Sequence, residues 1–293
     1  MFEAIISVAP TFRLPVLNWR KAAPALLVAP LLLFMLAFYA LPVLAMLMRS
    51  VAEPDWTLGN YAALAGDTVF VHVFWTTLRT AVAVTCGCLV LGFPVAMTLV
   101  RPGRTAAVAL IVVLLPFWTS ILVRSYAWMV LLGRHGLLNE MLLAGGIIDR
   151  PLRILNTSIA VHIAMIHILL PYMILPIANA LRQIDPSLPR AAQGLGATPY
   201  RVFREVILPL SMPGVAAGVL LVFVLSLGFY ITPALVGGPR DMTVSMLIAQ
   251  QVDQLNWPYA ACLSAVLLIA TLTIIAIFRF AFGVGRSLRI AGR

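Results

Sequence analysis

The 293-residue sequence is 62% apolar and only 10% charged, whereas soluble domains carry about 25% charged residues. This composition excludes a soluble globular domain and predicts one polytopic membrane domain, with no room for a separate soluble catalytic domain. The net charge of +10 comes almost wholly from arginine, and membrane topology explains it better than binding to nucleic acid does.

Six apolar segments are long enough to cross a membrane, since a spanning helix needs about 20 mostly apolar residues. These segments are Ala22–Met48, Val73–Val100, Thr105–Leu132, Thr157–Leu181, Leu208–Val236 and Trp257–Phe278. We therefore expect an all-α membrane protein with six transmembrane helices. An N-terminal tail covers residues 1–21, a transmembrane domain covers 22–280, and a C-terminal tail covers 281–293. Within the loop after the fifth segment, Met242–Asp253 is expected to form a short helix at the membrane surface.

Arginines are concentrated in the tails and in two of the loops, whereas acidic residues are concentrated in the other loops. The arginine-rich parts contain Arg13, Arg20, Arg101, Arg104, Arg182, Arg190, Arg201, Arg204, Arg279, Arg286, Arg289 and Arg293. Because short loops rich in arginine remain in the cytoplasm, we expect both termini and the segment 182–206 to be cytoplasmic.

Residue types that commonly carry chemistry are sparse. Cys86, Cys88 and Cys262 lie in apolar runs, and neither they nor the histidines show the spacing of metal ligands. No paired acids and no nucleophile–base set appear in the sequence. We therefore predict neither a catalytic site nor a metal site, and this argues against an intramembrane enzyme.

The stretch from Ser187 to Leu210 is the only long polar run within the apolar sequence. Ser187 is expected to cap a short helix, and Gly196 to end it in the left-handed conformation. Thr198 followed by Pro199 predicts the start of a second helix, since a hydroxyl cap and a proline at the first position are typical of helix N-termini. Pro209 is expected to break or kink that helix.

This stretch resembles the cytoplasmic EAA loop of the permease subunits of binding-protein-dependent ABC importers. Six residues match the pattern at its spacing: Ala191, Ala192, Gly196, Ile207, Leu208 and Pro209. Arg190 stands where the family has glutamate. The resemblance implies contact with an ATPase for the following residues: Arg190, Ala191, Ala192, Gly196, Ala197, Pro199 and Phe203.

Two further stretches, Leu114–Asn139 and Gly228–Pro239, resemble the spermidine/putrescine-type branch of these importers. The resemblance runs from about Leu26 to Phe280 and implies a type I importer fold in the bacterial inner membrane. It also implies a second, distinct permease, two ATP-binding subunits and an extracytoplasmic solute-binding protein as partners. The sequence has no GxxxxGK[ST] phosphate loop, so ATP and Mg²⁺ are expected on the partner ATPases and no cofactor is expected on this chain.

The substrate is harder to predict. Tentative pathway residues are Trp118, Arg124, Tyr126, Trp128, Tyr230, Thr232 and Asp253. No acidic residue lies in the core of a predicted span, although a polycation favours carboxylates or an aromatic cage. We therefore expect a small nitrogenous or organic solute that carries at most one positive charge or is anionic, and keep a polyamine as the alternative. His162 and His167 are interpreted as packing groups, and Arg79 as a side chain that reaches the interface. A secondary transporter remains the alternative function, although it needs acids within the membrane or broken helices.

Overall fold

The computed structural model describes residues 19–52, 56–101 and 103–282, and it places side chains from residue 27 to residue 280. The chain divides into two units, Met1–Met48 and Arg49–Arg293. Most of the two predicted tails, 1–21 and 281–293, lies outside the described residues.

The first unit carries a long apolar helix with one widened turn. It consists of α1 (Trp19–Met35), the π-helical turn η1 (Leu36–Ala40) and the start of α2 (Leu41–Ala52). In η1 the amide of Leu41 donates to the carbonyl of Leu36, and Pro42 follows directly. A proline ring clashes with the carbonyl four residues before it, and the wider turn relieves this clash without ending the helix.

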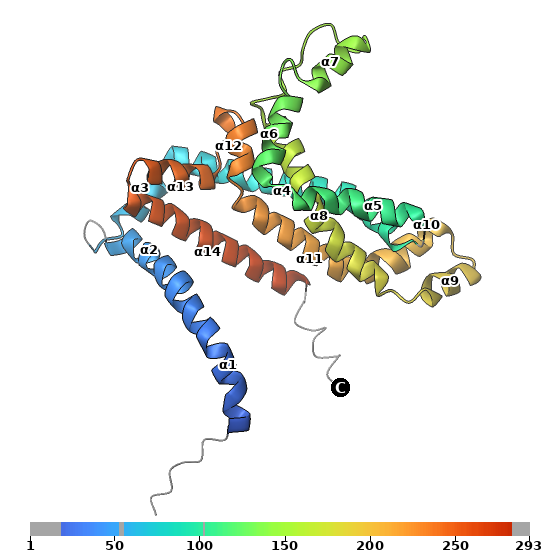
Figure 1. Cartoon of the computed structure of the whole chain (residues 1–293), viewed down its shortest axis with the longest axis horizontal. Helices are drawn as coiled ribbons and strands as arrows, with labels where there is room; N and C mark the ends of the chain where they lie inside the picture. Colours follow the sequence, from blue (N-terminus) through green and yellow to red (C-terminus); the bar gives the residue numbers. More distant parts are fainter. Residues whose placement is uncertain (1–18, 53–55, 102, 283–293) are drawn as a thin grey trace, which may run out of the picture. The chain divides into compact units, whose positions relative to one another are not determined.

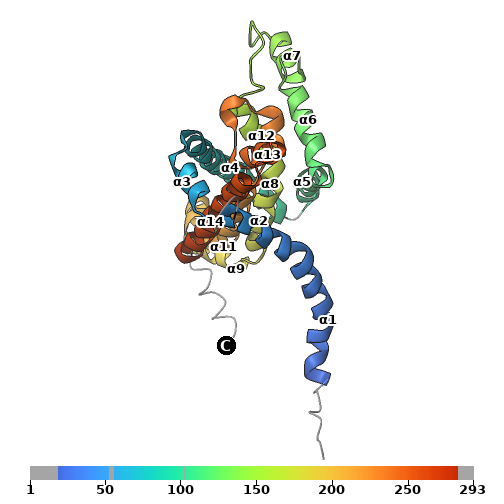
Figure 2. The same cartoon turned by 90° about the vertical axis from the view of Figure 1, so that its left-hand side faces the viewer.

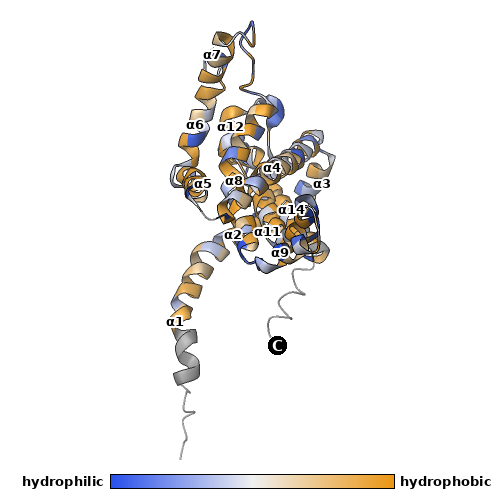
Figure 3. Ribbon diagram, turned by 90° about the vertical axis from the view of Figure 1, so that its right-hand side faces the viewer, coloured by the Kyte–Doolittle hydropathy of each residue, from blue (hydrophilic) through white to orange (hydrophobic). Residues whose placement is uncertain are grey.

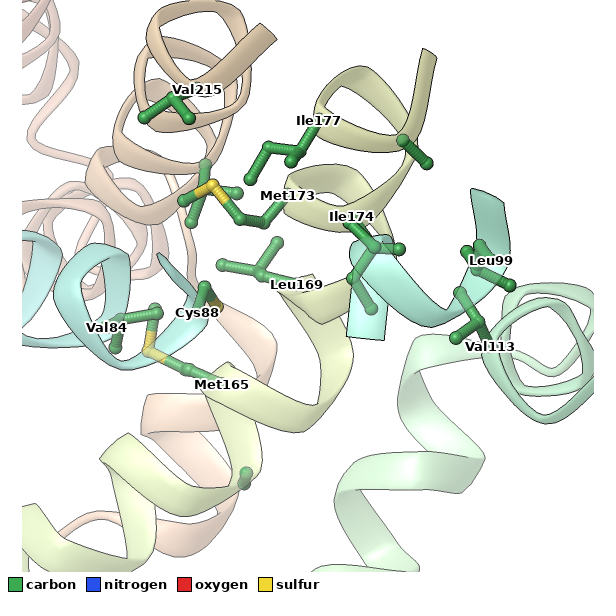
Figure 4. Packing of buried hydrophobic residues seen from close by; sticks show 14 of the residues in the cluster. Val84, Cys88, Leu99, Val113, Met165, Leu169, Met173, Ile174, Ile177 and Val215 are labelled. Atoms are coloured by element: carbon green, nitrogen blue, oxygen red, sulfur yellow. The ribbon is translucent and has the colours of Figure 1, made fainter. Parts of the chain in front are cut away.

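The second unit is built on three helices that pack against one another: α4 (Thr68–Val100), α8 (Ser158–Arg182) and α11 (Leu208–Leu227). They run side by side through the middle of this unit (Figure 1). Their contact faces form the main apolar core, in which Cys88 of α4 lies among Met165, Leu169 and Met173 of α8 (Figure 4). These side chains are buried from both lipid and water, and they pack densely between the three helices, as residues of a protein interior do.

Glycines allow α11 to approach α8 closely. A Cβ atom added to Gly214 would lie 2.4 Å from the Cβ of Ala180 and 2.6 Å from the carbonyl oxygen of Pro176. One turn later, a Cβ on Gly218 would meet the backbone and the sulfur of Met173. Helices in membranes commonly pack through such small residues, because these let the two backbones come together.

A second apolar cluster lies at the end of the unit where α4 begins. It joins α3 (Gly59–Gly66), α4, α13 (Val244–Asp253) and α14 (Trp257–Phe282) through Leu64, Val73, Leu247 and Leu263. The backbone amide of Val244 donates to the hydroxyl of Thr77 at 2.9 Å, which fixes the start of α13 on α4. The predicted short helix over 242–253 is thus confirmed as α13.

The third predicted span, Thr105–Leu132, is not one continuous helix. It comprises α5 (Arg104–Leu114), the 3-10 turn η2 (Leu115–Trp118) and α6 (Ile121–Leu131), with a bend of 103° at the break. Pro116 has no amide hydrogen to continue the helical bonding, and Ser120 caps α6 by accepting from the amide of Leu122 at 3.3 Å. Beyond the bend, α6 leads to α7 (Leu137–Ala144), and the two project together from the unit (Figures 1 and 2).

The fifth predicted span, Leu208–Val236, was wrong at both ends. The continuous helix begins at Pro199 with α10 (Pro199–Val202), passes through the π-helical turn η3 (Phe203–Ile207) and ends with α11 at Leu227. Gly228 disfavours further helix, and the chain turns into α12 (Ile231–Val236) and the 3-10 turn η4 (Pro239–Asp241). Of the two outcomes expected at Pro209, a break or a kink, the break does not occur; η3 lies just before this proline, as η1 lies before Pro42.

The described residues contain five helices that are long and apolar enough to cross a membrane, or six if α5 and α6 count as one bent span. The five are Leu27–Ala52, Thr68–Val100, Ser158–Arg182, Pro199–Leu227 and Trp257–Phe280. Apolar residues prevail along α4, α8, α11 and α14, as the colouring of Figure 3 shows. The expected all-α membrane fold is therefore confirmed, with a bend in its third span.

Asp67 links the start of α4 to the start of α14, and its charge can be tested. Its carboxylate accepts from the hydroxyl of Tyr259 at 2.9 Å and from the amide of Val69 at 2.8 Å. These bonds, that of Tyr259 first, hold the pKa of Asp67 below its usual value of 3.8. A lowered native pKa stabilises the fold above about pH 4, and this contribution is lost as the pH falls through the native pKa.

We expect Asp67→Ala to destabilise the protein by about 1 kcal/mol at pH 7, as for other lost helix caps. The difference from wild type should shrink toward pH 3, because the carboxyl group of the unfolded chain is largely protonated there and the native carboxylate loses its advantage. Thermal unfolding in detergent at several pH values measures this difference, with Asp149→Ala in an exposed loop as the control. An equal difference at pH 3 and pH 7 would contradict the assigned role of the charge.

Candidate functional site

The candidate coupling segment, residues 182–206, contains two short helices joined at a left-handed glycine. The first, α9 (Ser187–Gly194), is followed by Leu195 and then by Gly196 with φ of +86°. The amide of Gly196 donates to the carbonyl of Gln193 at 2.9 Å, and that of Ala197 donates to the carbonyl of Ala192 at 3.0 Å. This pair of bonds is a Schellman motif, and the predicted conformation of Gly196 is confirmed.

The start of α9 differs from the prediction that Ser187 caps it. Ser187 is already helical, and its backbone amide donates to the carboxylate of Asp185 at 2.8 Å. Pro186 has no amide hydrogen, so the amide of Ser187 is the first that a side chain at Asp185 can satisfy. The same bond is the main cause that lowers the pKa of Asp185, and the nearby guanidinium of Arg190 adds to it.

The start of α10 agrees with the prediction. The hydroxyl of Thr198 accepts from the amide of Arg201 at 3.4 Å, and Pro199 occupies the first helical position. Arg201 and Glu205, four residues apart on the helix, form an ion pair with an Nε–Oε1 distance of 3.4 Å. Both side chains are well exposed, so this pair contributes only about 0.5 kcal/mol.

The segment is joined to the helical core through α10 and η3. Val202 is buried, and the ring of Phe203 meets that of Phe93 on α4 edge to face, with centroids 5.7 Å apart. Phe203, one of the residues expected to contact an ATPase, is half-buried and makes this contact within the chain. These contacts connect the segment to both α4 and α11.

The segment exposes three large side chains among its polar ones. Leu188 is 47% exposed, Leu195 90% and Tyr200 70%. Arg190 and Ala191 are also exposed, while Ala192 and Ala197 are half-buried beside the turn. The small alanines leave the backbone of α9 open to close approach.

Two of the tentative pathway residues are used to pack α6 against its neighbours. Thr232 of α12 is buried, and its hydroxyl bonds that of Ser125 on α6 at 2.8 Å. The indole nitrogen of Trp128 donates to Nδ1 of His167 on α8 at 3.1 Å, with the rings edge to face. His167 therefore is the packing group expected from the sequence, and Thr232 has no free hydroxyl to offer a solute.

Arg124 lies on α6 near the same part of α8. It is close enough to Tyr172 and His167 to interact with both electrostatically. Its Nε atom is buried and has no hydrogen-bond partner among the described residues. A buried guanidinium nitrogen without a partner is expensive, so this arginine remains a candidate for contact with a solute or with another subunit.

The remaining pathway candidates do not converge on one point. Trp118, Tyr126 and Tyr230 are exposed on η2, α6 and the residue before α12. Asp253 is exposed at the end of α13, which packs mainly on α14 and α4. The structure thus places Arg124, Trp128 and Thr232 among α6, α8 and α12, whereas Asp253 lies on α13.

The sequence reasoning missed an internal carboxylate. Asp241 is buried, accepts from the hydroxyl of Ser158 on α8, and also accepts from the amide of Gly238 at 2.9 Å. These bonds hold the loop between α12 and α13 against the start of α8. The sequence feature that indicates this role is an aspartate three positions after a glycine, because aspartate side chains in turns commonly accept from a nearby backbone amide.

Comparison with known proteins gives a consistent result. Residues 88–286 match the family described as "Binding-protein-dependent transport system inner membrane component". The chain is 38% identical over 230 residues to the spermidine/putrescine transport system permease protein PotB of Haemophilus influenzae, covering 78% of this chain and 75% of that protein. Identity to PotB of Escherichia coli K12 is also 38%, over 216 residues that cover 73% of this chain and 78% of the relative.

The fold has a solved counterpart in a bacterial alginate ABC transporter, crystallised in complex with its alginate pentasaccharide-bound periplasmic protein. The TM-score is 0.71 at 19% identity, covering 90% of this chain and 96% of that one. The family match covers more than half of this chain, and both relatives are permeases that it matches over most of their length. The chain therefore belongs to the family of binding-protein-dependent transport system inner membrane components, the multi-pass permease subunits of ABC importers.

Proposed function

We propose that this chain forms half of a translocation pathway and receives ATP-driven movement through residues 182–206. The observation that carries this proposal is the geometry of the segment. Leu188, Leu195 and Tyr200 are exposed, its two helices are joined at the left-handed Gly196, and Phe203 and η3 connect it to α4 and α11. A push on α9 is therefore delivered to two spanning helices at once, as alternating access between two faces of a membrane needs.

The partners we propose are a second, distinct permease, two ATP-binding subunits and an extracytoplasmic solute-binding protein. ATP and Mg²⁺ would be held by the ATP-binding subunits and not by this chain. Arg190 supports one detail of this assembly: its exposed guanidinium predicts an acidic or neutral surface on the ATPase opposite it.

The lack of carboxylates in the spans argues against the alternative of an ion-coupled secondary transporter. Among the described spanning helices the one acidic residue is Glu205, which lies near a helix end and pairs with Arg201. Transporters of that class need in-membrane acids or broken helices to hold the coupling ion. The bend between α5 and α6 is a broken helix, but the side chains that face α8 and α12 there are Ser125, Trp128 and Arg124.

For the substrate we propose a polyamine or a related small nitrogenous solute. Likeness to two permeases named for spermidine and putrescine supports this class. The exposed rings of Trp118, Tyr126 and Tyr230 offer the cation–π contacts that such a solute needs in place of carboxylates. Because these contacts are weaker than a carboxylate pair, the partner permease and the binding protein would supply the acids for a polycation.

Purification of the assembled importer with its binding protein, followed by mass identification of the bound solute, tests the proposal. Uptake of labelled putrescine or spermidine at low micromolar concentration, lost when this gene is deleted, would support a polyamine. Uptake of a singly charged amine without competition from spermidine would restrict the substrate to the related solutes. Purification without any ATP-binding subunit would overturn the proposed assembly.

We also propose that both termini and residues 182–206 face the cytoplasm and that α3 and α13 face outward. The concentration of arginine at the α9 end supports this orientation. Single cysteines placed at Ala197 and at the exposed position Asp149 in a cysteine-free chain test it with a membrane-impermeant thiol reagent. In intact cells we expect labelling at position 149 and none at position 197, and labelling at position 197 would reverse the orientation.

A further inference from the structure

A cavity opens between α4, α8 and η4, away from the coupling segment and from the tentative pathway residues. Its volume is about 710 Å³. Its floor is apolar, with Leu78, Val82 and Ala83 of α4, and its polar side chains include Arg79, Arg240 and His162. It lies at the end of the unit that holds the start of α8 and the loop before α13.

The free charge in this cavity is positive. Arg79 and Arg240 are exposed, and no ion pair of either is found among the described residues. The only carboxylate in the lining is Asp241, whose two oxygens are already taken by Ser158 and by the amide of Gly238. An anion that enters the cavity would therefore meet two guanidinium groups and a carboxylate that is turned toward its own loop.

The position of Arg79 along α4 lets its side chain reach the interface where lipid phosphates lie. A helix of 33 residues is about 50 Å long, whereas the hydrocarbon core of a membrane is about 30 Å thick. With the excess shared by both ends, α4 extends about 10 Å beyond the core at its start. Arg79 lies eleven residues after Thr68, about 16 Å along the axis, which leaves it about 6 Å below the boundary. An arginine side chain can reach up over that distance to the interface.

The neighbouring residues fit the rest of a lipid. Trp75, one turn above Arg79, is 59% exposed and has the amphipathic ring that favours the membrane interface. Below Arg79, the exposed residues Val82 and Ala83 continue the same side of α4 as an apolar strip for an acyl chain. A free phosphate would use the arginines alone, whereas a phospholipid would use the arginines and the strip together.

We propose that this cavity is a binding site for the phosphate headgroup of a membrane phospholipid, with anionic phospholipids preferred. Arg79 and Arg240 hold the phosphate, and the strip formed by Leu78, Val82 and Ala83 holds one acyl chain. The lipid would fill the space between α4 and the loop fixed by Asp241, at the opposite end of the permease from the coupling segment. The two guanidinium groups of the site would bind the phosphate of the headgroup, as arginines commonly do in phosphate sites.

Native mass spectrometry of the full-length permease in its assembled importer tests this site. The probes are dioleoylphosphatidylglycerol, the matched diacylglycerol without phosphate, and inorganic phosphate. We expect retention of the phosphatidylglycerol, no retention of the diacylglycerol, and no displacement of the lipid by millimolar phosphate. Retention of the diacylglycerol to the same extent, or displacement by inorganic phosphate, would overturn the assignment to a phospholipid.

Variants separate the site from a general effect of charge. Arg79→Gln and Arg240→Gln should each weaken phosphatidylglycerol binding about five-fold, because a basic residue near a membrane surface strengthens binding of an anionic lipid by about this factor. If the two arginines contribute independently, the double variant should weaken binding about 25-fold. Arg150→Gln removes an exposed arginine outside the cavity and should leave binding unchanged. Equal binding by the double variant and the wild type would overturn the proposal.

Two further variants guard against a loss that comes from misfolding. Arg79→Lys keeps the charge and should retain most of the binding. Ala83→Trp fills the apolar strip, keeps both arginines and should reduce retention of the two-chain lipid. Weak binding by Arg79→Lys with full binding by Ala83→Trp would contradict a site built from charge and strip together. Because lipid binding is measured without transport, failure of this proposal is distinct from failure of the proposed import function.

Discussion

Gly196→Val is expected to abolish ligand-stimulated ATP hydrolysis in the assembled importer while leaving the permease in the membrane. Gly196 has φ of +86°, a conformation that costs other residues about 1–2 kcal/mol and a β-branched residue more. Nothing lies within 4 Å of an added Cβ atom, so the effect comes from the backbone and not from a clash. The valine would undo the Schellman motif and turn α9 away from its partner.

Two variants control for this change. Asparagine tolerates the left-handed conformation, so Gly196→Asn should retain most of the stimulation. Gly194→Val adds the same side chain two residues earlier, where φ is not positive and the space around the Cβ atom is open. Its stimulation should stay near that of the wild type. Full stimulation by Gly196→Val with the ATPase still bound would show that residues 182–206 do not couple the two subunits.

Gly214→Val should prevent stable packing of the three-helix core. The added Cβ atom would lie 2.6 Å from the carbonyl oxygen of Pro176 and 3.2 Å from the Cα atom of Ile177. These are backbone atoms that cannot rotate aside, so α11 must move away from α8. Overpacking of this kind typically costs about 1–3 kcal/mol, and we expect a value at or above the top of that range because two backbones are involved.

The measurement is the yield of monodisperse permease in detergent and its midpoint of thermal unfolding. Ala217→Val adds bulk to the same helix at an exposed position and should change neither quantity. Gly214→Ala should show an intermediate loss, since its Cβ atom makes the same contacts without the two further methyl groups. A midpoint for Gly214→Val equal to that of Ala217→Val would contradict the close approach of α11 to α8.

The local features of the coupling segment could be predicted from the sequence, because each depends on residues only a few positions apart. Gly196 ends α9 by its own conformational freedom, and Thr198 with Pro199 starts α10. The prediction that Ser187 caps α9 was wrong for an equally local reason: the carboxylate of Asp185, two residues earlier, accepts from the amide of Ser187 and so caps the helix. Hydropathy could not reveal the bend after Trp118 or the end of α11 at Leu227, since the chain remains apolar across both breaks.

The candidate pathway could not be assembled from the sequence, because its contacts join distant parts of the chain. Ser125 and Thr232 are 107 residues apart, and Trp128 and His167 are 39 apart. Each residue alone fits an apolar helix, and neither pattern nor spacing indicates its partner. The resemblance to a family could not show that the hydroxyl of Thr232 bonds that of Ser125, or that the ring of Phe203 packs against that of Phe93.

The widened turn η3 has a consequence for how side chains are oriented along the fifth span. A π-helical turn holds one residue more than an α-helical turn, so each such turn shifts the following side chains by about 100° around the axis. The side chains before η3 are therefore out of phase with those of α11, which pack against α8 and α4. The span thus presents its side chains in different directions on the two sides of η3. If residues 182–206 receive movement from a partner as proposed above, a rotation of the part before η3 would also turn the face that α11 presents to the core.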